Sequence, residues 1–313
     1  MSDLFIHQHI CVKKYLMLVA VIISSIGCIN AQPDSSCVRQ IVIPFGDEEE
    51  KIRFPELCDL GDMDVDDDGN IFIADWMVSS IKKYSPEGKY LGKLTAKGIQ
   101  FVEVVCYDHK LYSFYRGISN ENDLYIFSTT DMKLIEVKKR IFPWYLTSNA
   151  SRTFDDKLVF RLFKSPYEQK YSYQVYDLVS DEMFLDLDSP FHLPYLRYPF
   201  SENETLLLDS LGIGNPAYLG RVDHWLLFVK SILEPKYSIF FLNVNDKTNQ
   251  KKLEITFKVS ELGNMTYGDP INHWRFKKKR WLYYLGYRDD NVLISRIDLK
   301  NIFSEVYQDS NVE

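Results

Sequence analysis

Four aspartates and one glycine in a short stretch have the spacing of a calcium-binding loop. Asp64, Asp66, Asp68 and Asp75 occupy positions 1, 3, 5 and 12 of such a loop, and Gly69 occupies position 6. Hard oxygen ligands at alternate positions, with glycine at the sharp bend, are what Ca²⁺ requires. The same residues also suit a tight turn, in which an aspartate caps the backbone and Gly-Asn adopts positive φ. We therefore interpret the stretch as a structural turn without a cofactor, with a Ca²⁺ site as the alternative.

Histidines could also supply ligands or catalytic groups, but none follows a recognised metal-binding spacing. Those outside the N-terminal region are His109, His192, His224 and His273. A zinc site would require the fold to bring them together from distant parts of the chain. The Gly-x-Ser-x-Gly pattern of a serine nucleophile is absent from the sequence. The residue types therefore lean against an enzyme and predict no catalytic residue.

Composition favours strands and excludes a nucleic-acid-binding protein. The 313 residues include 15% aromatics, and the net charge of -7 is spread along the chain. A basic footprint of the kind that nucleic acids require is missing. The most basic run, Lys277 to Arg280, directly precedes the apolar run Trp281 to Leu285. We interpret that run as a solvated turn or strand edge.

The residues around the aspartates predict an antiparallel meander. Alternating apolar residues after Asn70 indicate one strand, Ile81 to Tyr84 a second and Tyr90 to Leu94 a third. The turn Ser85-Pro86-Glu87-Gly88 joins the last two. Short strands joined by tight turns are the unit of a β-propeller blade.

Fainter copies of this unit follow along the chain. Comparable strands begin 40, 47, 67 and 56 residues apart, near Ile71, Leu111, Leu158, Trp225 and Trp281. This period predicts an all-β propeller, with six blades of four-stranded antiparallel sheets formed by residues 37–313. The segment Cys37 to Phe45 is expected to complete the last blade, and Ile302 to Tyr307 to form a late strand. A short helical turn is expected at Val259 to Gly263.

The N-terminus has the features of a secretory signal within residues 1–31. Lys13-Lys14 precede an apolar run, Tyr15 to Ile26, that is too short to span a bilayer. Ser25-Ile26-Gly27-Cys28 is similar to a bacterial lipobox, in which Cys28 would carry the lipid. Ordinary cleavage after Ala31 is the alternative. Residues 32–36 would form a short tether, and we expect an exported protein that is anchored by the lipid or released outside the cytoplasm.

Cysteine usage allows one disulfide without specifying it. Cys37, Cys58 and Cys106 remain after the signal region, and no Cys-x-x-Cys pair occurs. An oxidising compartment permits one bond among the three, and buried free thiols fit equally well.

One family resemblance rests on Asp66 to Leu94. Its turn Asp-x-Asp-Gly-Asn, strand Ile-Phe-Ile-Ala-Asp and segment Pro-Glu-Gly-Lys-Tyr-Leu resemble an NHL-type repeat. With the lipobox-like signal, the chain resembles the six-bladed propeller lipoproteins of Bacteroidota. The resemblance implies a fold and an envelope location, and does not imply one activity.

Propellers usually bind ligands at the mouth of the central channel, which we expect on the face formed by the loops between second and third strands and by the loops between blades. Aromatic and charged residues there could stack on sugars or hold a peptide. The candidates are Trp76, Arg116, Trp144, Tyr167, Glu234 and Arg288, and the alternative for each is an ordinary loop or strand-edge position.

The sequence therefore predicts a non-catalytic binding or scaffolding module of the bacterial envelope. We expect a monomer with a protein or glycan partner, which contacts the membrane only through its N-terminal lipid. The alternatives are a propeller lyase or hydrolase with a metal site at the channel mouth, and a glycan-binding accessory protein.

Overall fold

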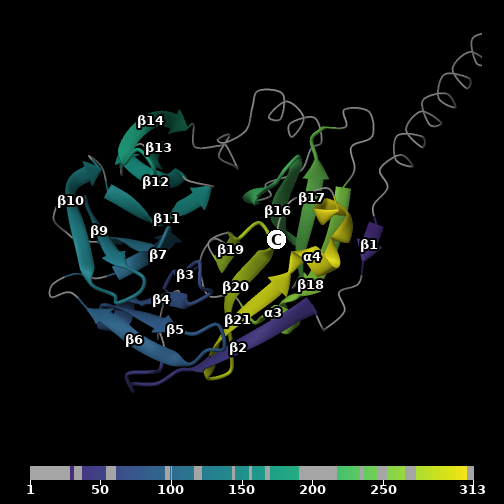
Figure 1. Cartoon of the computed structure of the whole chain (residues 1–313), viewed down its shortest axis with the longest axis horizontal. Coiled ribbons are helices and arrows are strands. Elements are labelled where there is room, and N and C mark those ends of the chain that lie inside the picture. The colour runs from purple at the N-terminus through teal and green to yellow at the C-terminus, as the bar shows by residue number, and fades with distance from the viewer. Residues whose placement is uncertain are drawn as a thin grey trace, which may run out of the picture.

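Among the described residues, strands make up almost all of the regular secondary structure in this computed structural model (Figure 1). It describes residues 29–31, 37–53, 61–95, 99, 101–115, 122–142, 145–154, 157–165, 170–189, 217–232, 236–245, 252–264 and 273–308. This part of the chain contains no helix with the length and hydrophobicity of a membrane span.

The first sheet is the predicted meander. It contains β3 (Met63–Val65), β4 (Ile71–Asp75), β5 (Ser80–Tyr84) and β6 (Tyr90–Thr95), paired antiparallel in chain order. Gly69 has φ 84° in the turn before β4, and Gly88 has φ 90° in the turn before β6. Both turns use the left-handed conformation that glycine adopts without steric cost.

Three more sheets follow in chain order, each an antiparallel meander. One holds β7 (Phe101–Tyr107), β8 (Lys110–Tyr115), β9 (Asn122–Ser128) and β10 (Leu134–Phe142), and the next β11 (Tyr145–Phe154), β12 (Lys157–Ser165), β13 (Lys170–Asp177) and β14 (Glu182–Ser189). The third holds β15 (Ala217–Val222), β16 (Trp225–Ile232), β17 (Lys236–Asn243) and β18 (Lys252–Lys258), with β1 (Ile29–Ala31) parallel to β18 at its edge.

The last sheet joins the two ends of the chain. Its strands β19 (Trp274–Lys277), β20 (Trp281–Arg288) and β21 (Asn291–Asp298) are completed by β2 (Val38–Pro44), which pairs antiparallel with β21 along its whole length. Ile41 and Ile43 of β2 are buried, whereas Val42 between them is 53% exposed. This pairing confirms the prediction that the N-terminal strand completes the last blade.

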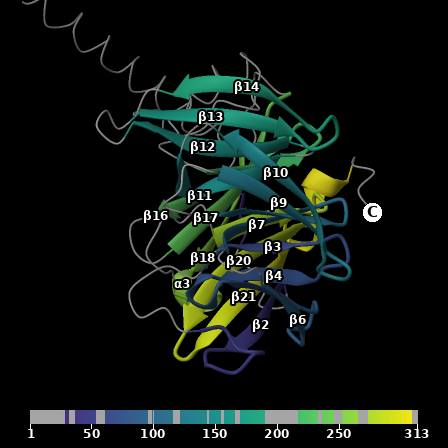
Figure 2. The same cartoon turned by 90° about the vertical axis from the view of Figure 1, so that its left-hand side faces the viewer.

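The first strands of successive sheets lie side by side, as in a β-propeller. β3 contacts β7 and β19, β7 also contacts β11, and β19 also contacts β15. Figure 1 shows β3, β7 and β19 turned toward the middle of the molecule, and Figure 2 shows the succession of sheets from the side. The described residues form five blades. The segment 190–216, where a further partial blade was predicted, lies outside them.

The expected strand over Ile302 to Tyr307 is wrong. The chain forms α4 (Leu299–Ile302) and then the 3₁₀ helix η4 (Ser304–Tyr307). Asp298 caps α4 by accepting a hydrogen bond from the Lys300 N–H. Since β2 already occupies the outer edge of β21, the segment that follows β21 cannot pair with that strand, and its apolar residues pack as helices. The short helix α3 (Val259–Leu262) lies where a helical turn was expected.

Candidate ligand-binding site

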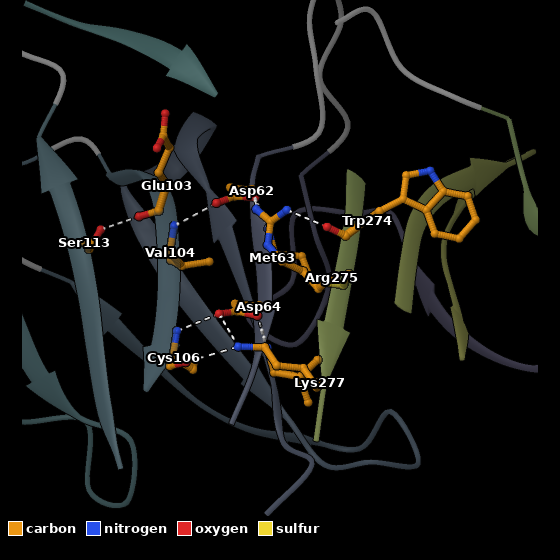
Figure 3. Close-up of polar contacts among 11 residues, drawn as sticks. Asp62, Met63, Asp64, Glu103, Val104, Cys106, Ser113, Trp274, Arg275 and Lys277 are labelled. Atoms are coloured by element: carbon orange, nitrogen blue, oxygen red, sulfur yellow. Dashed lines mark hydrogen bonds and ion pairs between the residues drawn. The ribbon is translucent and has the colours of Figure 1, made fainter. Parts of the chain in front are cut away.

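Asp64 of β3 and Asp62, the residue just before β3, hold the edge of the neighbouring blade. Because side chains two residues apart point to the same side of a strand, Asp62 and Asp64 both face β7. Asp62 Oδ2 accepts a hydrogen bond of 3.1 Å from the Val104 N–H, and Asp64 Oδ2 accepts one of 2.7 Å from the Cys106 N–H (Figure 3). The carboxylates thus satisfy backbone groups that no strand pairs with.

The same carboxylates are paired with cations from a third blade. Arg275 and Lys277 of β19 have the same two-residue spacing, and Arg275 pairs with Asp62. Lys277 Nζ lies 2.7 Å from Asp64 Oδ2 and also donates to the Cys106 carbonyl at 3.1 Å. We call Asp62, Asp64, Arg275 and Lys277 the axial ion-pair cluster, since they join the inner strands of three blades (Figure 3).

Burial decides the electrostatics at Asp62. Loss of solvent raises the pKa of this carboxyl to about 7; the nearby Glu103 and Asp64 add to the rise, and the Arg275 guanidinium opposes it. The folded protein therefore binds more protons than the unfolded chain between the unfolded pKa of about 4 and about 7.

Because the folded state holds the extra proton, this group should make stability fall as pH rises from about 4 to about 7. Urea unfolding at pH 5, 6, 7 and 8 tests this, with Asp62→Asn as the comparison. The free energy of unfolding of the wild type should decrease with pH more steeply than that of the variant. Parallel pH profiles for the two proteins would show that Asp62 does not titrate in this range.

A pocket lies at the end of the axial ion-pair cluster, where the inner strands end. It has a volume of about 190 Å³ and reaches from Asp67 and Cys106 to Lys279. Apolar walls are provided by Tyr107 at the end of β7, Tyr218 of β15 and Phe276 of β19. Residues from four blades therefore meet at one small cavity, the arrangement in which propellers and other folds hold ligands.

Cations dominate the polar lining of this pocket. Arg221, Lys277, Lys278 and Lys279 contribute four positive charges, and Asp67 contributes one negative charge. Low-dielectric walls with charges of one sign concentrate the electric field in a cleft. The pocket is therefore suited to an anionic group, although the whole chain carries a net charge of -7.

Two irregular backbone segments shape the pocket. The turn between β19 and β20 closes with a hydrogen bond from the Arg280 N–H to the Lys277 carbonyl, and Lys278 and Lys279 have φ 52° and 49°. Such a turn normally uses Asn-Gly, so lysine at both positions costs energy and is a feature associated with functional sites. On the opposite wall, β15 is bulged between Tyr218 and Gly220.

The Cys106 thiol at the pocket is not poised to act as a nucleophile. Cys106 is buried and free, and burial raises the pKa of its thiol well above the ordinary value. Since the thiolate is the reactive form, this position disfavours thiol chemistry. Cys37 is also a free thiol, and Cys58 lies outside the described residues.

The aspartates with calcium-loop spacing take separate partners. Asp66 caps the turn, because its Oδ1 accepts from the N–H groups of Asp68 and Asn70 at 3.0 and 2.8 Å. Asp75 instead pairs with Lys82 at 2.8 Å, and Asp64 belongs to the axial ion-pair cluster. The hydrogen bonds to Asp66 form the turn before β4.

The histidines that the structure describes lie in separate parts of the fold, and His192 lies outside the described residues. His109 lies in the turn after β7, with φ 59°, and His224 lies in the turn before β16. His273 is buried beside the Tyr284 ring. Among the described residues, no three His, Cys, Asp or Glu side chains are grouped to hold a metal ion.

Trp76 and Arg288, the expected channel-mouth residues that the structure describes, are not among the residues that line this pocket. Trp76 lies between β4 and β5, and Arg288 ends β20, where it donates to the Ser260 carbonyl. Both lie at connections between second and third strands, whereas Asp67 and Lys278 come from turns between first and second strands. The remaining predicted positions, Cys28, Arg116, Trp144, Tyr167 and Glu234, lie outside the described residues.

The pocket was not predicted from the sequence, because Lys277 to Arg280 was interpreted only as a solvated turn or strand edge. The turn is present, and it also carries the pocket's cations. A usable signal was the matched spacing of Asp-x-Asp at 62–64 and Arg-x-Lys at 275–277, since each pair projects from one side of a strand.

Comparisons with known proteins give no family. No family model matches the chain, and no curated protein matches it. Among solved structures, a Bacteroides fragilis protein described as exported is 10% identical, with 86% of this chain and 97% of that chain covered and a TM-score of 0.41. The Neurospora crassa Pan2 WD40 domain is 11% identical, with 75% and 62% covered and a TM-score of 0.32.

A streptogramin B lyase is 9% identical, with 83% of this chain and 73% of that chain covered and a TM-score of 0.34. All three TM-scores lie below 0.5. The propeller assignment therefore rests on the strand topology of this chain, and these likenesses carry no argument about its function.

Proposed function

We propose that this protein is an exported, non-catalytic binding module whose ligand occupies the pocket at the end of the axial ion-pair cluster. The observation that carries the proposal is the convergence of Asp67, Tyr107, Tyr218 and Phe276, from four blades, on one cavity. A rigid scaffold that presents loop and strand-end residues at a shared cavity is the usual design of a binding site.

The composition of the pocket favours binding over catalysis. Asp67 is the single carboxylate among the residues that line it, so the lining offers no pair of acids for general acid–base chemistry. The one thiol, Cys106, has a pKa raised by burial. The cations and aromatic rings of the pocket are groups that hold and orient a ligand.

Export and anchoring are supported by the N-terminal sequence. The apolar run before Cys28 and the lipobox-like residues support a lipid on Cys28. Processing at Cys28 would retain β1, which pairs with β18, whereas cleavage after Ala31 would remove it. A protein processed at Cys28 would therefore keep the edge of β18 covered.

Labelled palmitate tests the anchor in the producing bacterium. The wild type should incorporate the label and fractionate with the membrane, and Cys28→Ala should do neither. Equal labelling of both proteins would overturn the lipid proposal and leave the pocket proposal standing.

Thermal unfolding tests the pocket. A ligand that binds only the native state raises the unfolding midpoint, so we expect at least one member of a panel of sugars, amino acids and short peptides to do so. Lys278→Ala/Lys279→Ala should lose that rise. A rise that persists in the variant would place the ligand elsewhere, and the absence of any rise across the panel would count against a small-ligand site.

A further inference from the structure

We propose that the pocket is specific for a carboxylated sugar unit, such as a uronate within an acidic saccharide. This inference rests on the proposed function and adds the chemical class of the ligand. It follows from three properties of the pocket: its charge, the defined backbone turn that carries two of its cations, and its size and walls.

The positive charge of the pocket is concentrated on one turn and is available to a ligand. Lys278 and Lys279 are exposed, and within the described part of the chain neither forms an ion pair. Lys277, by contrast, is committed to Asp64. An arriving carboxylate could therefore accept hydrogen bonds from Lys278 and Lys279 without breaking the axial ion-pair cluster, and such charge-assisted bonds are the strong ones.

The backbone of these two lysines is held in a defined turn. Both residues have φ near 50°, and the hydrogen bond from Arg280 N to Lys277 O closes the turn at 3.1 Å. Lys277 is held on the other side of the turn by Asp64 and the Cys106 carbonyl. The ion-pair cluster therefore anchors the turn that carries the two available ammonium groups, which reduces the backbone entropy lost on binding.

The walls and the volume favour a sugar ring over a bare anion. Tyr107, Tyr218 and Phe276 offer ring surface beside the cations, and aromatic side chains combine apolar faces with polar tips. The volume of about 190 Å³ is smaller than the cavities that hold drug-sized ligands. It suits one sugar unit whose C–H face lies on the rings and whose carboxylate reaches the lysines.

Close packing keeps one of these rings in place. A Cβ on Gly220 would lie 2.5 Å from the Phe276 ring, so glycine at this position lets the ring lie against β15. The bulge at Tyr218 to Gly220 and the ring of Phe276 thereby form one wall.

Calorimetric titration with trigalacturonate tests the inference, using the processed protein. The fully methyl-esterified trisaccharide is the matched neutral ligand. We expect the wild type to bind the acid, and to bind the ester about tenfold more weakly. The double variant Lys278→Gln/Lys279→Gln should bind the acid about tenfold more weakly than the wild type, because it loses the charge-assisted hydrogen bonds. Binding of the ester should not change in that variant.

Lys236→Gln/Lys258→Gln is the matched control. These two exposed lysines are cross-strand partners in β17 and β18, and their replacement changes the net charge equally. The control should bind trigalacturonate as the wild type does. An equal loss in both double variants would indicate a general charge effect and would overturn the proposed site.

Two other outcomes separate this inference from the proposed function. Equal binding of acid and ester, both lost in Lys278→Gln/Lys279→Gln, would overturn the carboxylate class and leave the pocket as the ligand site. Displacement of trigalacturonate by triglutamate at equal concentration would show that the pocket recognises negative charge and not the sugar ring. An acidic peptide would then be its ligand class. Absence of binding by either trisaccharide would overturn the sugar class outright.

Discussion

Replacing Asp64 with asparagine should lower the free energy of unfolding by about 3 kcal/mol, the lower end of the range for a broken buried ion pair. Asp64 is fully buried and Lys277 is mostly buried, so the substitution leaves the ammonium group without a compensating charge. The asparagine oxygen can still accept from the Cys106 N–H, but its amide nitrogen then replaces Oδ1, which accepts from the Val65 N–H. The loss therefore combines the missing charge with one backbone hydrogen bond. Urea unfolding measures it.

A surface pair of the same chemistry is the matched control. Asp131 and Lys133 form an exposed ion pair at 3.2 Å. Asp131→Asn should cost less than about 1 kcal/mol, because solvent screens exposed pairs. The double variant Asp64→Asn/Lys277→Gln should recover part of the loss, since it removes both charges. If Asp64→Asn were as mild as Asp131→Asn, the axial ion-pair cluster would not stabilise the propeller.

Introducing aspartate at Ile43 should destabilise the protein by more than about 4 kcal/mol, the range that indicates a disrupted core. Ile43 is 1% exposed and packs in the core shared by the last and first sheets. The substitution removes that apolar contact and buries a charge without a partner. We expect a much lower urea midpoint, or no cooperative transition.

Val42→Asp tests the same strand from its other side. Val42 is 53% exposed, so aspartate there remains in water, and we expect a change of less than about 1 kcal/mol. A large contrast between adjacent positions is the signature of a strand with one buried face. Equal effects at the two positions would mean that β2 does not close the propeller in solution.

The strands were predictable because their signals are local. Alternating apolar residues and turn residues fixed β4, β5 and β6 within one or two positions. The segment 302–307 was misread as a strand, because its apolar residues also suit a short helix. That choice depends on β2, which is distant in sequence and takes the edge of β21.

The candidate site was not predictable to the same degree, because its contacts are long-range. Asp62 and Arg275 are 213 residues apart in sequence, and only the closed fold brings them together. The same holds for Lys278 and Tyr107, whose roles depend on which turns share an end of the axis. Asp64 fitted a calcium loop by spacing, yet its carboxylate faces two other blades.

The most direct test of the pocket is the acetylation rate of each lysine in the processed protein, measured by mass spectrometry with and without saturating trigalacturonate. The proposed site predicts that the ligand slows acetylation at Lys278 and Lys279 and leaves Lys236 and Lys258 unchanged. Unchanged rates at Lys278 and Lys279 while trigalacturonate is bound would contradict the site, and would place the ligand on another part of the propeller.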